Sequence, residues 1–195
     1  MKKKLITRSR DNLKLETRST EDGKYLEGYF ALFDNETELW PGAFESIDRK
    51  AFDNTLDGDI RALINHDTTL VLGRTKSGTL ELETDEKGLK GRIKINENDT
   101  DALNIYERVK RGDVSGNSFG FVINEEDTEY KEDGSIKWTI RDLELFEVSV
   151  TTFPAYEETS IEARKKEYRS LSKQSLEKKK EQLRRKLDVK SSDVK

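Results

Sequence analysis

Hydrophobic residues recur along this chain in short runs that predict β-strands over most of its length. A nearly continuous apolar run predicts a first strand over 24–33, covered on both faces. Apolar and polar positions then alternate over 79–84 and again over 89–95, and the residues between these runs form a charged turn signal that ends in Gly88. The second pattern predicts an antiparallel hairpin.

Two helices are expected among the strands. The apolar residues of 100–111 have helical spacing, Asp99 or Thr100 can cap the first turn, and Gly112 suits the left-handed position that ends a helix. A turn signal over 40–44 predicts a second, shorter helix that follows it and runs through Phe52.

The other strands complete a mainly β pattern. They are predicted over 59–65, 114–123, 136–140 and 143–153, with a charged hairpin tip at 124–134. Many short strands with two inserted helices predict an α+β protein in which the strands close into a small barrel with peripheral helices. We expect three regions: a polar N-terminal segment (1–22), one folded domain (23–163) and a tail (164–195).

The tail differs from the rest of the chain in charge. Residues 164–195 carry 13 Lys and Arg against 5 Asp and Glu, a net charge of +8, which leaves −12 on residues 1–163. This predicts a basic tail that is a solvated helix, a disordered segment or an arm for a partner. No run approaches the ~20 apolar residues that span a bilayer, and no signal peptide is seen, so we expect a cytosolic protein without membrane contact.

His66 is the only histidine, and the chain has no cysteine. A zinc site needs several His, Cys or carboxylate ligands, and one imidazole without thiolates argues against such a site. We therefore expect neither a metal nor an organic cofactor. If His66 is catalytic, it acts as a general base for a hydroxyl, with a carboxylate as the third group. The alternative is a surface or hydrogen-bonded structural histidine at the end of a strand.

Two serines within 113–121 are candidate nucleophiles. Successive side chains of a strand point to opposite faces, so Ser118 shares a face with Gly116 and Gly120, whereas Ser115 shares a face with phenylalanines. The glycines would leave Ser118 in a clearing that a peptide can approach, which favours Ser118. A bulge at Gly116 would exchange the faces, and Ser115 therefore stays as the alternative nucleophile.

Glu147 is the candidate for the third group. It lies in an apolar strand, where a carboxylate without a partner is costly to bury. His66 is one candidate partner, because a carboxylate would hold the imidazole in the tautomer that accepts a proton. A salt bridge to Arg74 or Arg141, or a position on the surface, is the structural alternative. Weaker candidates for the catalytic acid are Asp113 and Asp142.

Six blocks of sequence carry a family resemblance. They are Gly28–Phe33, Pro41–Phe44, Ala62–Asp67, Val71–Thr75, Asp113–Phe121 and Glu147–Ala155. In this order and at these spacings they resemble the prohead maturation proteases of tailed bacteriophages. The resemblance spans about residues 24–163, and it implies a fold related to that of the herpesvirus assembly proteases, a small β-barrel with surrounding helices.

The resemblance also implies a serine endopeptidase, with Ser118 as the nucleophile and His66 as its base. The herpesvirus enzymes use a second histidine as their third catalytic residue. This chain has none, so either Glu147 takes its place or the site is a dyad. Arg74 or backbone N–H groups would stabilise the oxyanion. The implied substrates are the scaffolding region of the phage major capsid protein and the chain itself, cleaved inside the procapsid in the host cytoplasm, with contacts between copies of the chain.

Two other classes of function compete with this one. The main alternative is a non-catalytic capsid scaffold or assembly chaperone, in which the same fold binds coat protein and His66 is structural. Nucleic-acid binding is suggested by the basic tail alone. The charge of −12 on residues 1–163 would repel phosphate, and the tail has a single tyrosine for stacking, so we expect no nucleic-acid partner.

Overall fold

The computed structural model describes residues 5–9, 13–131 and 133–153 continuously. The chain divides into two compact units, Met1–Tyr156 and Glu157–Lys195. The described residues of the second unit are helical; they are 164–166, 168, 169, 173, 180, 181 and 184. The rest of the predicted basic tail lies outside the described residues.

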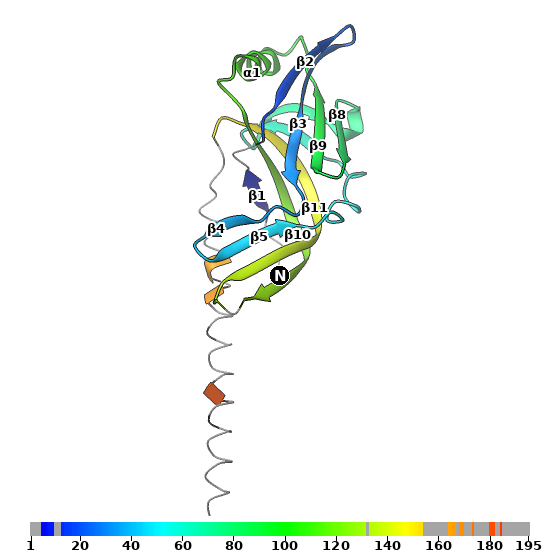
Figure 1. Cartoon of the computed structure of the whole chain (residues 1–195). Coiled ribbons are helices and arrows are strands. Elements are labelled where there is room, and N and C mark those ends of the chain that lie inside the picture. Colours follow the sequence, from blue (N-terminus) through cyan, green and yellow to red (C-terminus); the bar gives the residue numbers. More distant parts are fainter. Residues whose placement is uncertain are drawn as a thin grey trace, which may run out of the picture. The chain divides into compact units, whose positions relative to one another are not determined.

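Strands of the first unit that the structure describes form two sheets (Figure 1). The larger contains β1 (Ile6–Ser9), β4 (Thr37–Trp40), β5 (Ala43–Ile47), β6 (Arg61–Ile64), β7 (Asp67–Arg74), β10 (Gly116–Tyr130) and β11 (Ile136–Thr151). The smaller contains β2 (Glu16–Thr20), β3 (Gly23–Leu32), β8 (Leu80–Thr84) and β9 (Gly88–Lys94). The expected mainly β class is therefore confirmed, as is the β8–β9 hairpin.

The strand orders leave both sheets open. They are β1-β10-β11-β5-β4, with β6 joining β11 to β7, and β2-β3-β9-β8. Pairing among the described strands does not close either sheet on itself, so the expected closed barrel is not confirmed. Two of the strands, β1 and β2, lie within the first 22 residues, which the sequence predicted only as a polar segment.

The long strand β11 organises the larger sheet. It pairs with β10 along most of its length, and the two strands form a curved pair in Figure 1. The first half of β11 pairs in parallel with β5, and its second half pairs in parallel with β6. The end of β6 is thereby placed beside the last residues of β11, where the candidate site lies.

One of the two predicted helices is confirmed. Helix α1 (Thr100–Arg111) begins after Asp99, whose side chain accepts the N–H groups of Asp101 and Ala102, and it ends at Gly112 with φ 88°. The helix predicted over 45–52 is wrong. Its first residues form β5, and the rest form successive turns, because pairing with β4 and β11 outweighs the local helical preference. A short 3₁₀ helix, Thr75–Ser77, follows β7.

Aromatic side chains fill the core on one face of β10. The rings of Phe119 and Phe121 are stacked 4.8 Å apart, and Phe52 lies 6.1 Å from Phe119. On the same face, the amide of Asn117 donates to a backbone carbonyl of β3 at 2.6 Å and so ties the two sheets together. Because neighbouring residues of a strand alternate, Ser118 points to the opposite face.

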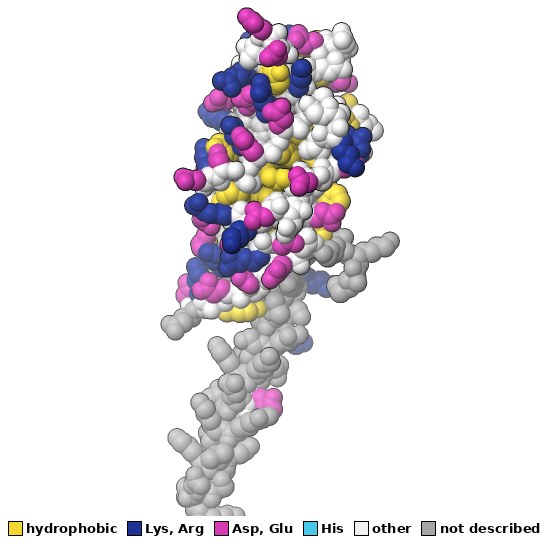
Figure 2. Space-filling view, turned by 90° about the vertical axis from the view of Figure 1, so that its right-hand side faces the viewer, with side chains coloured by type: hydrophobic (Ala, Val, Ile, Leu, Met, Phe, Trp, Pro, Cys, Tyr) yellow, Lys and Arg dark blue, Asp and Glu magenta, His cyan; other side chains and the backbone are white. Residues whose placement is uncertain are grey.

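Charges of both signs cover the surface. Figure 2 shows acidic and basic side chains intermingled over one face of the molecule, with hydrophobic side chains exposed between them. A continuous basic surface, which nucleic-acid binding would require, is not seen on that face. Within the part of the chain that the structure describes, no helix is long and apolar enough to cross a membrane.

Candidate active site

His66 lies in a tight two-residue loop between β6 and β7. Asn65 and His66 have φ angles of 51° and 62°, the left-handed pair typical of a type I′ hairpin turn, in which glycine is favoured. This conformation costs about 1 kcal/mol or more for a residue with a side chain. Hydrogen bonds hold it: Asn65 N–H donates to the Val150 carbonyl at 2.9 Å, and Thr152 N–H donates to the Asn65 side chain at 2.9 Å.

Glu147 is the partner of the imidazole. Its Oε1 lies 2.8 Å from Nδ1 of His66, and its side chain is 9% exposed. An ionised carboxylate only accepts, so this contact places the ring proton on Nδ1 and leaves Nε2 as the acceptor. The second carboxylate oxygen, Oε2, accepts the hydroxyl of Ser149 at 2.6 Å. Glu147 is therefore buried and oriented through both oxygens.

The other nitrogen of the imidazole is buried. Nε2 of His66 is shielded from solvent and has no hydrogen-bond partner among the described residues. A buried nitrogen with an unused lone pair is rare, because its desolvation is not repaid by a hydrogen bond. Such an atom is suited to accept a proton from a group that enters or reorients in the site.

Ser118 lies on the same face of the sheet as Glu147 and Ser149. In the register of β10 and β11, Ser118 is directly opposite Ser149, and Gly120 is directly opposite Glu147. The register shift in this region follows Gly120 and does not occur at Gly116, so Ser118 shares its face with both glycines. Cross-strand neighbours have Cβ atoms about 5 Å apart, which places Ser118 next to Ser149, whose hydroxyl contacts Glu147 and the His66 backbone.

The surroundings of Ser118 differ from the expected clearing. Ser118 is fully buried, and its hydroxyl donates to the carbonyl of Arg8 in β1 at 2.9 Å. The glycines leave room for side chains of β11 and not for an open approach: a Cβ on Gly116 would meet Oγ1 of Thr151 at 2.7 Å, and one on Gly120 would meet Oε1 of Glu147 at 2.3 Å.

The rival candidates lie elsewhere. Ser115 is exposed and precedes β10. Asp113 is paired with Arg111, and Asp142 accepts a weak hydrogen bond from Asn54 at 3.4 Å. No described contact joins either aspartate to the imidazole, so Glu147 is the carboxylate that the structure brings to His66.

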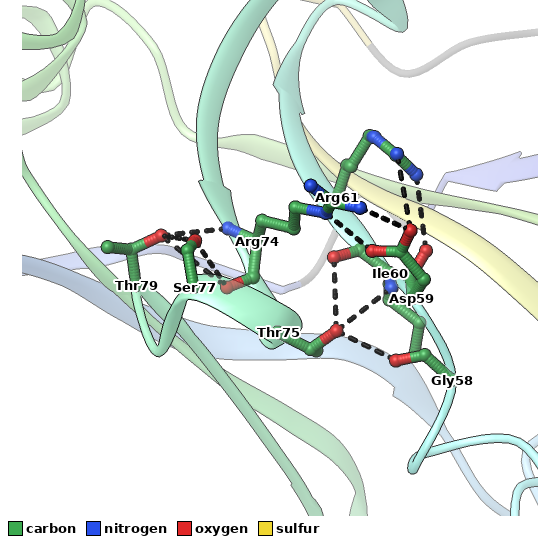
Figure 3. Close-up of polar contacts among 8 residues, drawn as sticks. All are labelled: Gly58, Asp59, Ile60, Arg61, Arg74, Thr75, Ser77 and Thr79. Carbon is green, nitrogen blue, oxygen red and sulfur yellow. Dashed lines mark hydrogen bonds and ion pairs between the residues drawn. The ribbon is translucent and has the colours of Figure 1, made fainter.

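Arg74 is held in an ion pair at some distance along β7 from the turn. Figure 3 shows its guanidinium against Asp59, which accepts both Nε and Nη2 at 2.6 Å and also contacts Arg61 at 3.3 Å. The hydrogen bonds from Arg74 lower the pKa of Asp59 to about 2, and the charge of Arg61 adds to the effect. Arg141 is paired with two other aspartates. The salt-bridge alternative for Glu147 is therefore wrong, and the oxyanion role of Arg74 stays a prediction.

A shallow pocket of about 350 Å³ opens beside His66. It is lined by Asn65, His66, Thr151, Thr152 and Phe153. The ring of Phe153 is 79% exposed, and Oγ1 of Thr151 is buried without a partner among the described residues. The pocket can therefore offer the apolar surface of Phe153 to a bound chain, whereas the Thr151 hydroxyl faces the interior.

Sequence reasoning missed Ser149. Its signal is present in the sequence, because Glu147, Ser149 and Thr151 place polar side chains at every second position of an otherwise apolar strand. It also missed Asn117, which lies in the predicted strand over 114–123 and whose buried side-chain amide donates to backbone carbonyls of Leu13 and Tyr29. Within the described residues, no cluster of three or more His, Asp or Glu side chains has the arrangement of a metal site.

Comparison with known proteins agrees with the resemblance seen in the sequence. Residues 12–174 match the model of the caudovirus prohead serine protease family. The prohead protease of Enterobacteria phage HK97 is 33% identical over 160 residues, which cover 77% of this chain but only 65% of that protein's length. The solved bacteriophage T4 capsid assembly protease overlaps 75% of this chain and 96% of its own, at 10% identity and a TM-score of 0.47. The chain belongs to the caudovirus prohead serine protease family.

Proposed function

We propose that the protein is a serine endopeptidase of phage prohead maturation. It cleaves the scaffolding region of the major capsid protein, and also its own chain, within the procapsid in the host cytoplasm. The observation that carries the proposal is the imidazole of His66. Its Nδ1 contacts a buried carboxylate at 2.8 Å, while its Nε2 has no hydrogen-bond partner among the described residues. Membership of the family supplies the class of reaction.

In the proposed reaction, Oγ of Ser118 attacks the carbonyl carbon of a peptide bond, and Nε2 of His66 takes the hydroxyl proton. Glu147 stabilises the imidazolium that forms. The tetrahedral intermediate collapses when the imidazolium returns the proton to the leaving amine. Water then attacks the acyl-enzyme with His66 again as the base, which releases the carboxylate product and restores the serine.

Two conditions must be met before Ser118 can attack. Its single hydroxyl proton is donated to the Arg8 carbonyl, so this bond must break before Nε2 of His66 can accept the proton. Rotation of the Ser118 hydroxyl would break this bond without movement of β1, where Arg8 is anchored to Glu45 by a nearly buried ion pair at 2.6 Å. The oxyanion must also be stabilised, for which backbone N–H groups near Ser118, or Arg74, are the candidates.

The pocket beside His66 would hold a substrate side chain next to the bond that is cut. The exposed ring of Phe153 favours an apolar contact there. The fold relation to the herpesvirus assembly proteases and contacts between copies of the chain stay predictions.

The test is cleavage of the cognate major capsid protein by the purified full chain, followed by gel electrophoresis and intact-mass measurement. Wild type and Ser115→Ala should produce the same fragments, whereas Ser118→Ala and His66→Ala should produce none. Adding Ser118→Ala as the substrate tests cleavage of one copy by another. If Ser118→Ala retains cleavage and Ser115→Ala loses it, Ser115 is the nucleophile and the assignment of Ser118 is wrong.

The same assay separates the proposal from its main alternative. A capsid scaffold or chaperone would bind the capsid protein and change its assembly without producing fragments. Absence of fragments with wild type, together with altered capsid assembly, would support the scaffold.

A further inference from the structure

Ser149 occupies the centre of the candidate site, although the proposed reaction gives it no step. It lies in β11 two residues after Glu147, directly opposite Ser118 in β10, and it is fully buried. On the other side it pairs with Leu63 of β6, two residues before the turn that carries His66. Ser149 therefore lies between the strand that carries Ser118 and the strand that leads to His66.

The hydroxyl of Ser149 joins two of these residues. Its Oγ donates to Oε2 of Glu147 at 2.6 Å and accepts the backbone N–H of His66 at 3.2 Å. A serine hydroxyl has one proton, and both the carboxylate and the N–H have fixed roles, so the directions of the two bonds are set. One oxygen atom thus orients both the acid and the backbone of the base.

Each bond restrains a different motion. The bond to Glu147 keeps the carboxylate from rotating away from Nδ1 of His66. Because its acceptor is charged, this hydrogen bond is stronger than one between neutral groups. The bond from the His66 N–H supports a left-handed residue with φ 62°, whose conformation is otherwise unfavourable. Loss of the hydroxyl would free both the acid and the turn.

We propose that Ser149 is a positioning residue for catalysis, which holds His66 in its Nδ1-protonated tautomer by fixing Glu147 and the His66 backbone. The proposal rests on the proposed serine endopeptidase function. A merely structural serine would contribute to folding without affecting the state of the imidazole, and this difference can be measured.

The kinetic test compares Ser149→Ala with a matched control, Ser46→Ala. Ser46 is another buried serine of the larger sheet, and its hydroxyl contacts Thr139 at 3.3 Å, outside the candidate site. Loss of a hydrogen bond to a charged group predicts that kcat for capsid-protein cleavage falls by about 10- to 100-fold in Ser149→Ala, with KM within about twofold. Ser46→Ala should keep wild-type kcat, and Ser149→Thr, which retains a hydroxyl, should restore most of the turnover.

The spectroscopic test uses the single histidine of the chain, whose imidazole signals need no assignment. Nitrogen-15 NMR of histidine-labelled full chain, in the Ser118→Ala background that prevents self-cleavage, distinguishes the two neutral tautomers. We expect the Nδ1-protonated form when Ser149 is present and also in Ser149→Thr, and a mixture of tautomers in Ser149→Ala.

The proposal is overturned if Ser149→Ala keeps wild-type kcat, if Ser46→Ala loses as much, or if kcat falls while the imidazole spectrum stays that of wild type. Failure of the underlying function has a different signature: wild type would then not cleave, or Ser118→Ala would cleave as well as wild type. The tautomer measurement requires no cleavage and therefore tests Ser149 in either case.

Discussion

Replacing Gly120 with alanine should separate His66 from its carboxylate while the fold stays intact. A Cβ at position 120 would lie 2.3 Å from Oε1 and 3.0 Å from Cδ of Glu147. The first distance is about 1 Å inside an ordinary van der Waals contact. β10 is paired with β1 on one side and β11 on the other, so its backbone has little freedom to retreat. The carboxylate must therefore leave its position 2.8 Å from Nδ1 of His66.

The expected loss of activity follows from this displacement. Misplacing an oriented catalytic group by about 1 Å costs roughly 10²-fold in rate, and removing the correct acid from a Ser-His-acid site costs up to about 10⁴-fold. We therefore expect kcat/KM for cleavage of the capsid protein to fall by roughly 10²-fold in Gly120→Ala. The melting temperature should fall by only about 5 °C, since the change is confined to a flexible side chain.

Gly91→Ala is the matched control. Its Cβ would meet the Phe30 ring at 2.6 Å in the smaller sheet, so it should lower the melting temperature without changing turnover. Because Gly120→Ala acts through Glu147, it should cause no further loss in a Glu147→Ala background. Wild-type turnover in Gly120→Ala, or a further loss of roughly 10²-fold on top of Glu147→Ala, would refute this reasoning.

Three further predictions concern the surroundings of the site, and a fourth concerns β1. Alanine tolerates a left-handed backbone less well than asparagine, so Asn65→Ala in the His66 turn should reduce both the melting temperature and turnover. Asp34→Ala, at a left-handed residue outside the site, should reduce only the melting temperature. The folded-state pKa of Asp59 lies near 2, below its usual 3.8, so its contribution to stability is present above pH 3.8 and is lost as the pH falls towards 2; thermal melts should show a smaller loss over this range in Asp59→Asn. If Arg74 stabilises the oxyanion, Arg74→Ala should lower kcat while Asp59→Asn does not, and unchanged kcat in both would end that role. Removal of residues 1–12 takes away the Arg8 carbonyl, which accepts the hydroxyl proton of Ser118. The initial rate of capsid-protein cleavage should therefore rise. An unchanged rate in a folded variant would contradict this.

The sequence predicts elements whose signals are local. The β8–β9 hairpin and α1 are encoded by two-residue and helical spacing with turn and cap residues, and both are present. The helix predicted over 45–52 is wrong because β5 is stabilised by parallel pairing with β11. That strand lies far along the chain, and no local pattern reports its contact with β5. The charged residues after Ile123 were assigned to a hairpin tip, whereas β10 continues through them to Tyr130 with most of their side chains exposed.

Much of the candidate site could also be predicted from local patterns in the sequence. Strand parity places Ser118 on the face of the glycines, and the cost of burying Glu147 requires a partner, which the structure provides in His66. The contact between Ser118 and Arg8 spans 110 residues and depends on which strand occupies the edge of β10. The role of Ser149 depends on the register of three strands. The contact with Arg8 leaves no periodic signal in the sequence, and the polar alternation over 147–151 marks the face of Ser149 without revealing its partners.

The most direct test of the account is the residue that a fluorophosphonate modifies, since this reagent bonds to a serine hydroxyl activated by a neighbouring base. Mass spectrometry of the labelled full chain should find the adduct on Ser118, and His66→Ala should abolish labelling while Ser115→Ala leaves it unchanged. An adduct on Ser115, or labelling of Ser118 that is independent of His66, would contradict the central claim that His66 activates Ser118.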